Sequence, residues 1–223
     1  MEALIGFSGF AVLIAVILLV IFCVAFLPKL GGTYEPPEKR AGRIGEEYAT
    51  KIIKSVLREG DRLFTNVEIE CDGKRAELDN VVVNQYGVFI IEVKNYVGQL
   101  YGREDDYQWQ KVKVTDAGNA YEKTVDNPIR QVRRQVYVLA KFLERCNIHI
   151  WVDGYVILLH GNSPVKSNFV LERVDDIDIA IHSLGMKDTY NSDSFSRGTR
   201  KEALSCNTII AISEILGNFG VEE

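Results

Sequence analysis

Two short apolar segments that lie close together in the sequence constrain the fold of this chain most strongly. Residues 77–83 and 88–94 both contain Val, Ile or Phe, which favour β-strands, and only four residues ending in Gly87 separate them. Such a short link with a glycine predicts a β-hairpin. If the turn is centred between Gln85 and Tyr86, Asp79 lies directly opposite Glu92 on the neighbouring strand.

Charged side chains on this predicted hairpin indicate a functional site. Asp79 and Glu92 would lie close enough to share a cation, and Lys94 projects from the same face as Glu92. We expect Asp79 to share its face with the valines that follow it, and Glu77 on that face is an alternative to Asp79. Charges on an apolar surface are costly to bury. A structural ion pair is the ordinary explanation, but we favour a divalent metal site, and oxygen ligands without His or Cys suit Mg²⁺ or Mn²⁺.

The beginning of the chain predicts a membrane anchor. Residues 3–27 carry no charge and would form a helix about 37 Å long, against a bilayer core of about 30 Å. A signal peptide is the alternative, but its apolar core is usually shorter and follows a cationic residue. We therefore expect a transmembrane helix over residues 1–28. Cations after it predict an outer N-terminus and a cytoplasmic C-terminal domain. Glycines and prolines predict a linker over residues 29–41.

The rest of the chain predicts one α/β domain. Helical and extended patterns give the order α-β-β-β-α-β, which indicates a mixed sheet flanked by helices. We expect helices at residues 42–58, 127–145, 175–184 and 200–216, and strands or extended segments at residues 63–71, 77–83, 88–94, 107–114 and 150–159. Residues 42–160 would form the core, and residues 161–223 an α-rich extension of the same domain.

The first of these helices contributes a third carboxylate. On a helical wheel, Glu46 falls at the margin of an apolar stripe that includes Ile44 and Tyr48, whereas Glu47 falls on the far side. An acidic residue in a first helical turn also favours the helix dipole, which is the ordinary explanation for Glu46. Because Asp79 and Glu92 are predicted to bind a metal on the hairpin, however, Glu46 is a candidate third carboxylate.

The helix that begins after Asn127, its expected N-cap, has two contrasting sides. Apolar residues line one side, and the opposite side carries cations: Arg130, Arg134, Lys141 and Arg145. These cations either form a solvated helix face or contact phosphates of a nucleic acid. Gln131 and Gln135 lie near the boundary between the two sides, within possible reach of the predicted metal site on the hairpin.

The overall charge and the cysteines exclude some classes of protein. The formal net charge of −5 argues against broad electrostatic coating of nucleic acid, although a local basic patch remains compatible with it. The four cysteines are scattered and the three histidines have no metal-ligand spacing, so neither type predicts a zinc site. Scattered apolar cysteines are typical of a reduced cytosolic domain.

The ordered set of motifs resembles the nuclease-related domain family, a branch of the PD-(D/E)xK nuclease superfamily. The resemblance covers about residues 42–160. It rests on Gly42-x-x-Gly45-Glu46, Asp79, the strand Gly87 to Lys94 with its Glu-x-Lys, Asn95-Tyr96, Gly98, Trp109 and Asn127-Pro128-x-x-Gln131. Leu78 stands where the superfamily has a proline before the aspartate, and that proline is not a ligand.

The resemblance implies a restriction-endonuclease-like core and a role for each site residue. Asp79 and Glu92 would bind Mg²⁺ or Mn²⁺ with help from the Val93 carbonyl and Glu46, and Lys94 would position or activate water. Gln131 would match the family's helix glutamine. We therefore expect a membrane-anchored, metal-dependent hydrolase that cleaves DNA or RNA. A non-catalytic nucleic-acid-binding module and a membrane scaffold with unknown protein partners are the alternatives, since fold does not establish function.

Overall fold

The computed structural model describes residues 16–17, 20–21, 35–114, 118–183 and 203–223. Most of the expected membrane helix and residues 29–34 of the expected linker lie outside these residues. Within the described part of the chain, no helix is both long and apolar enough to cross a bilayer. The chain divides into two compact units, Met1–Arg40 and Ala41–Glu223, and the second contains the folded domain.

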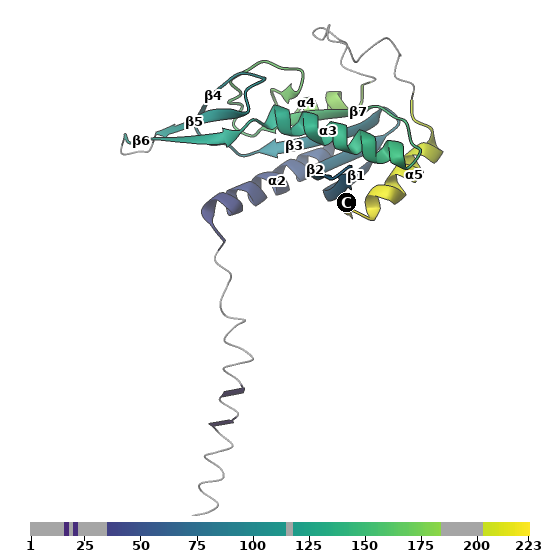
Figure 1. The fold of residues 1–223 in the computed structure, drawn as a ribbon, viewed down its shortest axis with the longest axis horizontal. Coiled ribbons are helices and arrows are strands. Elements are labelled where there is room, and N and C mark those ends of the chain that lie inside the picture. The colour runs from purple at the N-terminus through teal and green to yellow at the C-terminus, as the bar shows by residue number, and fades with distance from the viewer. Residues whose placement is uncertain (1–15, 18–19, 22–34, 115–117, 184–202) are drawn as a thin grey trace, which may run out of the picture. The chain divides into compact units, whose positions relative to one another are not determined.

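The domain is built on a mixed β-sheet with helices on both faces, which confirms the predicted mixed α/β class (Figure 1). The described strands of this sheet, in spatial order, are β8 (Val170–Leu171), β7 (Val152–Leu158), β3 (Gly87–Lys94), β2 (Lys74–Asn84), β1 (Arg62–Cys71) and β9 (Val221–Glu222). The described helices are α2 (Pro37–Val56), α3 (Pro128–Arg145), α4 (Asp176–Ile181) and α5 (Cys206–Gly217). Strand β2 pairs antiparallel with both β1 and β3, whereas β3 and β7 are parallel.

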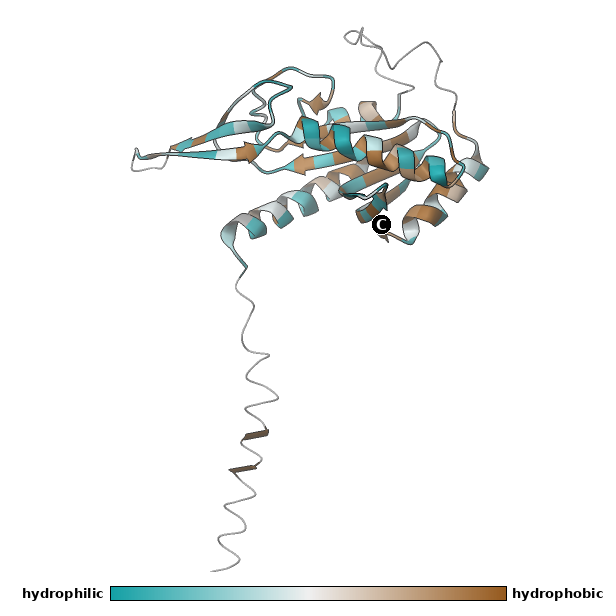
Figure 2. Ribbon diagram, in the orientation of Figure 1, coloured by the Kyte–Doolittle hydropathy of each residue, from teal (hydrophilic) through white to brown (hydrophobic). Residues whose placement is uncertain are grey.

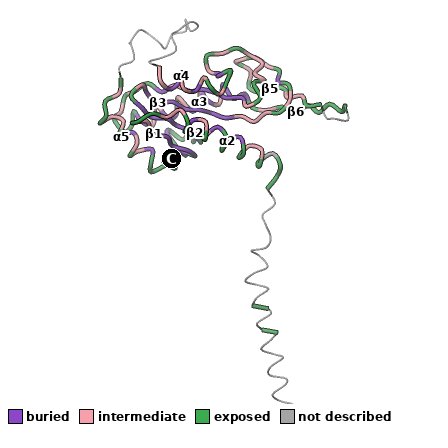
Figure 3. The backbone as a smooth tube through the Cα atoms, turned by 180° about the vertical axis from the view of Figure 1, so that it is seen from behind, coloured by how far each residue is buried: buried purple, intermediate pink, exposed green. Residues whose placement is uncertain are grey.

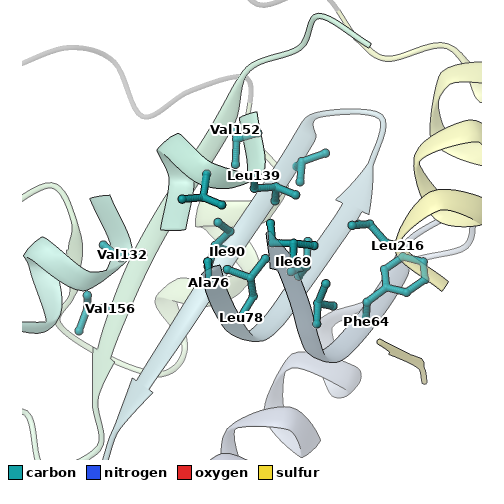
Figure 4. Packing of buried hydrophobic residues seen from close by; sticks show 14 of the residues in the cluster. Phe64, Ile69, Ala76, Leu78, Ile90, Val132, Leu139, Val152, Val156 and Leu216 are labelled. Atoms are coloured by element: carbon teal, nitrogen blue, oxygen red, sulfur yellow. The ribbon is translucent and has the colours of Figure 1, made fainter. Parts of the chain in front are cut away.

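Two apolar clusters hold the helices on the sheet. One cluster joins the sheet to α3 and α5, with Phe64, Ile90, Leu139 and Leu216 among its buried members (Figure 4). The other joins the opposite face to α2 and α4. The central strands are therefore buried on both sides, as Figure 3 shows. This explains why their sequence is a continuous apolar run rather than a regular alternation.

The predicted hairpin and its register are confirmed. Strands β2 and β3 pair from Asn84 opposite Gly87 to Asn80 opposite Ile91, which is the register of a turn centred between Gln85 and Tyr86. The predicted register is therefore correct over these five pairs, and Asp79 and Glu92 lie just beyond the last of them.

The alternation of side chains along β2, in contrast, differs from the expectation. Leu78, Val81 and Val83 all belong to the cluster on the α3 side, which a regular alternation does not allow. The irregularity falls at Asp79, which lies opposite Asn66 of β1, a residue with a φ of 52°. The expectation that Asp79 simply continues the face of Val81 and Val83 is therefore wrong, because the backbone of both strands is irregular at this point.

The helix ends are also only partly as predicted. Helix α3 begins as expected, with the Asn127 side chain accepting a hydrogen bond of 2.9 Å from the Ile129 amide. Helix α2 starts at Pro37 rather than Gly42, because a proline is well accommodated in a first helical turn. Ile44 and Tyr48 are exposed, so these two residues do not belong to the buried stripe of α2, whereas Ala49 and Ile53 on the expected side are fully buried.

A second sheet was not predicted. Strands β4 (Gln99–Tyr101), β5 (Gln108–Val114) and β6 (Ala120–Asp126) pair in this order and are inserted between β3 and α3. We call residues 99–126 the arm; its described residues extend from the core and are largely hydrophilic toward the outer end (Figure 2). The sequence predicted only an extended segment over residues 107–114. Strand β6 has no regular alternation of apolar residues, because nearly all of the strand is exposed.

Candidate functional site

The core of the site is an acidic pair and a lysine at the end of the β2–β3 hairpin. Glu92 is 0% exposed, and its Oε1 lies 2.6 Å from the Nζ of Lys94. The backbone amide of Val93 donates a hydrogen bond of 3.1 Å to the Oδ2 of Asp79. The hairpin thus brings Asp79, Glu92 and Lys94 together, as the sequence predicted.

Helix α3 holds Glu92 through two glutamines. The amide of Gln131 donates a 2.6 Å hydrogen bond to Oε1, and the amide of Gln135 donates one of the same length to Oε2. Gln135 also donates to the carbonyl oxygen of Glu77 at 2.8 Å. Both carboxylate oxygens of Glu92 therefore have a donor, which is what a fully buried carboxylate requires.

The sequence placed Gln135 near the predicted metal site but did not predict it as a site residue. Gln135 is buried, and its spacing of four residues from Gln131 places both amides on one side of α3. This spacing could have identified Gln135 from the sequence. Glu77, the sequence alternative to Asp79, has an exposed side chain and contributes its backbone carbonyl instead.

Close packing of α2 brings Glu46 toward the same end of the sheet. Gly45 is buried, and a Cβ atom there would lie 3.0 Å from the side chains of Asn95 and Leu159. Asn95, which follows Lys94, also donates a 2.8 Å hydrogen bond to the carbonyl of Ala41. A glycine at position 45 therefore allows α2 to approach the site.

The electrostatics of the site follow from burial and from the neighbouring carboxylates. Burial and the charge of Glu92 raise the pKa of Asp79 to about 7, although the Val93 amide and Lys94 act in the opposite direction. Burial also raises the pKa of Glu46, and Lys94 partly offsets this. For Lys94, burial lowers the pKa, but the charge and hydrogen bond of Glu92 outweigh it, so the pKa is raised and the amine stays charged.

These properties fit a divalent cation. Two carboxylates lie together with one ammonium group, and the raised pKa of Asp79 indicates that its negative charge is poorly compensated. Carboxylate oxygens suit a hard cation such as Mg²⁺ or Mn²⁺. No group of three acidic, His or Cys side chains in the described part of the chain is arranged to hold a metal. Glu46 therefore interacts with the site electrostatically without completing a three-carboxylate cluster.

The raised pKa of Asp79 predicts a pH-dependent stability in the absence of metal. From the ordinary value of 3.8 up to about 7, the unfolded chain loses this proton while the folded protein keeps it, so stability falls as the pH rises. We expect the wild-type protein to lose about 2 to 3 kcal/mol more than Asp79→Asn between pH 5 and pH 8. Denaturant unfolding with EDTA at both pH values measures this, and equal losses would contradict it.

The cations predicted on α3 all contact groups of the protein itself. The guanidinium of Arg130 lies 3.9 Å from the ring centroid of Tyr107, and Arg134 donates to the carbonyl of Arg75 at 2.8 Å. Lys141 pairs with Glu144 and Arg145 pairs with Asp72. A role for these four cations in nucleic-acid binding stays a prediction, and phosphates would have to compete with these contacts.

Comparison with known proteins identifies the family. The model of the nuclease-related domain, NERD, matches residues 41–159, which include every site residue described above. An uncharacterized protein of Bacillus anthracis is 24% identical over 108 residues, 48% of this chain and 49% of that protein. The chain thus spans about half the length of this relative. No solved structure matches the chain. Because the family model covers more than half of its length, the chain belongs to the nuclease-related domain family.

Proposed function

We propose that the domain is a metal-dependent phosphodiesterase that cleaves DNA or RNA and has a restriction-endonuclease-like core. The observation that carries this proposal is the buried Glu92, held by two glutamines and bonded to Lys94, beside an Asp79 of raised pKa. Strongly perturbed carboxylates with a fixed lysine are typical of catalytic sites. Membership of a nuclease-related family agrees with this reaction class.

Each residue has a defined part in this proposal. Asp79 and Glu92 would hold Mg²⁺ or Mn²⁺ with help from the Val93 carbonyl, and Glu46 would help through its negative charge rather than by completing a cluster of three carboxylates. When bound, the ion would supply Lewis-acid polarisation of the phosphate and a more acidic water. Lys94 places a positive charge where negative charge grows on the phosphorus oxygens. Gln131 and Gln135 fix the orientation of Glu92.

Metal binding at the acidic pair is expected to stabilise the protein. A ligand that binds only the folded state raises its stability by RT ln(1 + [L]/Kd), about 2.7 kcal/mol at one hundred times Kd. We expect Mg²⁺ or Mn²⁺ to raise the melting temperature of the wild type and not that of Asp79→Asn. Thermal unfolding with EDTA and with each metal measures this. An equal rise in the variant would place the metal elsewhere.

A cleavage assay separates the enzyme from its alternative. The full-length protein is incubated with single- and double-stranded DNA and RNA, in Mg²⁺, in Mn²⁺ and in EDTA, beside Glu92→Gln prepared in the same way. Metal-dependent products from the wild type alone support the proposal. Binding without products in either metal would support a non-catalytic nucleic-acid-binding module, an alternative that the acidic net charge also favours.

We also propose that the domain is attached to the cell membrane. The support is the uncharged sequence of residues 3–27 and the cations that follow it. The positive-inside rule then gives an outer N-terminus and a cytoplasmic domain. A nuclease so placed would act on nucleic acid close to the inner surface of the membrane.

A further inference from the structure

One face of the arm gathers cations and an aromatic side chain. In the antiparallel pair of β5 and β6, Lys111 lies directly opposite Lys123, and Lys113 lies opposite Tyr121. Opposed residues share a face, and successive odd-numbered residues of β5 share it too. We call Lys111, Lys113, Lys123 and Tyr121 the lysine face. The acidic residues of these two strands, Glu122 and Asp126, belong to the other face of the ribbon.

The lysine face leads to the candidate site. Its inner end is formed by Trp109, which is fully buried in the cluster on the α3 side of the sheet, where Glu92 also lies. The Nζ of Lys111 lies 5.6 Å from the ring centroid of Tyr96. Tyr96 follows the proposed catalytic lysine, Lys94, by two residues, so the lysine face lies beside the segment that leaves the site.

The base of the arm is firmly held, so the position of the lysine face is defined. The side-chain amide of Asn162 donates to the carbonyls of Tyr96 and Gly98 at 2.7 and 2.6 Å. The amide of Asn127 donates to the carbonyls of Glu104 and Asp106, each at 2.8 Å. These bonds fix both the entry to the arm and its return to α3.

Three lysines on one face of a narrow ribbon provide a local positive charge that complements a polyanionic ligand. Tyr121 lies among them and is 61% exposed, although a tyrosine gains stability from burial. Cations that follow a backbone, combined with an aromatic ring on which a base can stack, are the features of single-strand binding surfaces.

We propose that the lysine face binds a single-stranded segment of nucleic acid and guides it to the site of Asp79, Glu92 and Lys94. The phosphates would contact the three lysines, and a base would stack on Tyr121. This inference rests on the proposed function for the kind of substrate and adds the strand form and the surface that recognises it.

Binding in EDTA tests the inference without cleavage. The probes are a fluorescent 20-nucleotide oligothymidylate and a 20-base-pair duplex, and fluorescence anisotropy gives Kd at several salt concentrations. The variant Lys111→Gln/Lys113→Gln/Lys123→Gln should bind the single strand at least 10-fold more weakly. Its slope of log K against log salt should fall by about 2, because each phosphate contact contributes about 0.7. Lys51→Gln/Lys74→Gln/Lys166→Gln, with the same change of charge elsewhere, is the control and should bind like the wild type.

Tyr121 distinguishes a single strand from a duplex. Tyr121→Ala should weaken single-strand binding about 10-fold at an unchanged salt slope, because the stacked base is lost while the phosphate contacts remain. Tyr121→Phe should bind normally, and duplex binding should be unaffected by either change. Equal loss in both lysine variants, or a Tyr121 effect on the duplex, would overturn the inference while the proposed nuclease stands. A wild type that binds neither probe and cleaves nothing would overturn both.

Discussion

Replacing Lys94 with alanine is expected to reduce nucleic-acid cleavage by about 100- to 1,000-fold, the usual effect of removing one group that stabilises transition-state charge. The ammonium group lies 2.6 Å from Glu92, and its side chain is 22% exposed, so it is fixed but open to a ligand. The rate constant kcat should fall, whereas KM should change little, because the loss concerns the transition state. Single-turnover cleavage with saturating protein measures the effect.

Two companion variants separate catalysis from stability. Lys94→Arg keeps a positive charge beside Glu92 and should preserve the fold, but the planar guanidinium cannot replace an ammonium at the reacting phosphate. Its cleavage rate should therefore remain low. Lys51→Ala, an exposed lysine of α2, should cleave at the wild-type rate. Full activity of Lys94→Ala at unchanged metal dependence would remove Lys94 from the mechanism.

Gln135→Leu is expected to produce the largest loss of stability of any change at the site, about 2 to 4 kcal/mol. The substitution removes the donor to Oε2 of Glu92, and a buried charge that loses its partner is strongly destabilising. Gln131→Leu should cost less, because Lys94 still donates to Oε1. Denaturant unfolding in EDTA gives both values.

A double-mutant cycle with Glu92→Gln assigns the loss to the charge. If Gln135 acts by stabilising the carboxylate, its replacement by leucine should cost clearly less when residue 92 is neutral. An equal cost in the two backgrounds would mean that the hydrogen bond to the carbonyl of Glu77, or packing within α3, is what Gln135 provides.

The centre of the site was accessible from the sequence because local rules determine it. The four-residue link fixed the register of the hairpin, which brings Asp79 and Glu92 to the same end of it. The spacing of two residues placed Lys94 beside Glu92. These relations depend on one turn and one strand, so no knowledge of distant contacts was needed.

The errors arose where distant segments decide the geometry. The wheel of α2 counted Ile44 and Tyr48 in the apolar stripe, but both are exposed, and the buried side includes Gly45 together with Ala49 and Ile53. The glycine lets α2 pack closely on the sheet, which hydrophobicity does not report.

The irregular alternation at Asp79 and the strand β6 were missed for related reasons. The first involves Asn66, a residue of the neighbouring strand with positive φ. The second is an exposed strand without an apolar pattern. Its pairing with β5 forms it, and the local sequence does not report that pairing.

The bonds at the base of the arm have an evolutionary consequence. Asn127 caps α3 with its carbonyl oxygen and holds the returning chain with its amide, so the excursion between β3 and α3 is closed where it begins. Residues inserted or deleted between Val112 and Glu122, in the outer part of the arm, would leave Asp79, Glu92 and Lys94 in place. If the arm selects the nucleic acid as proposed, proteins with this core could exchange the outer arm and change that selection while Asp79, Glu92 and Lys94 stay the same.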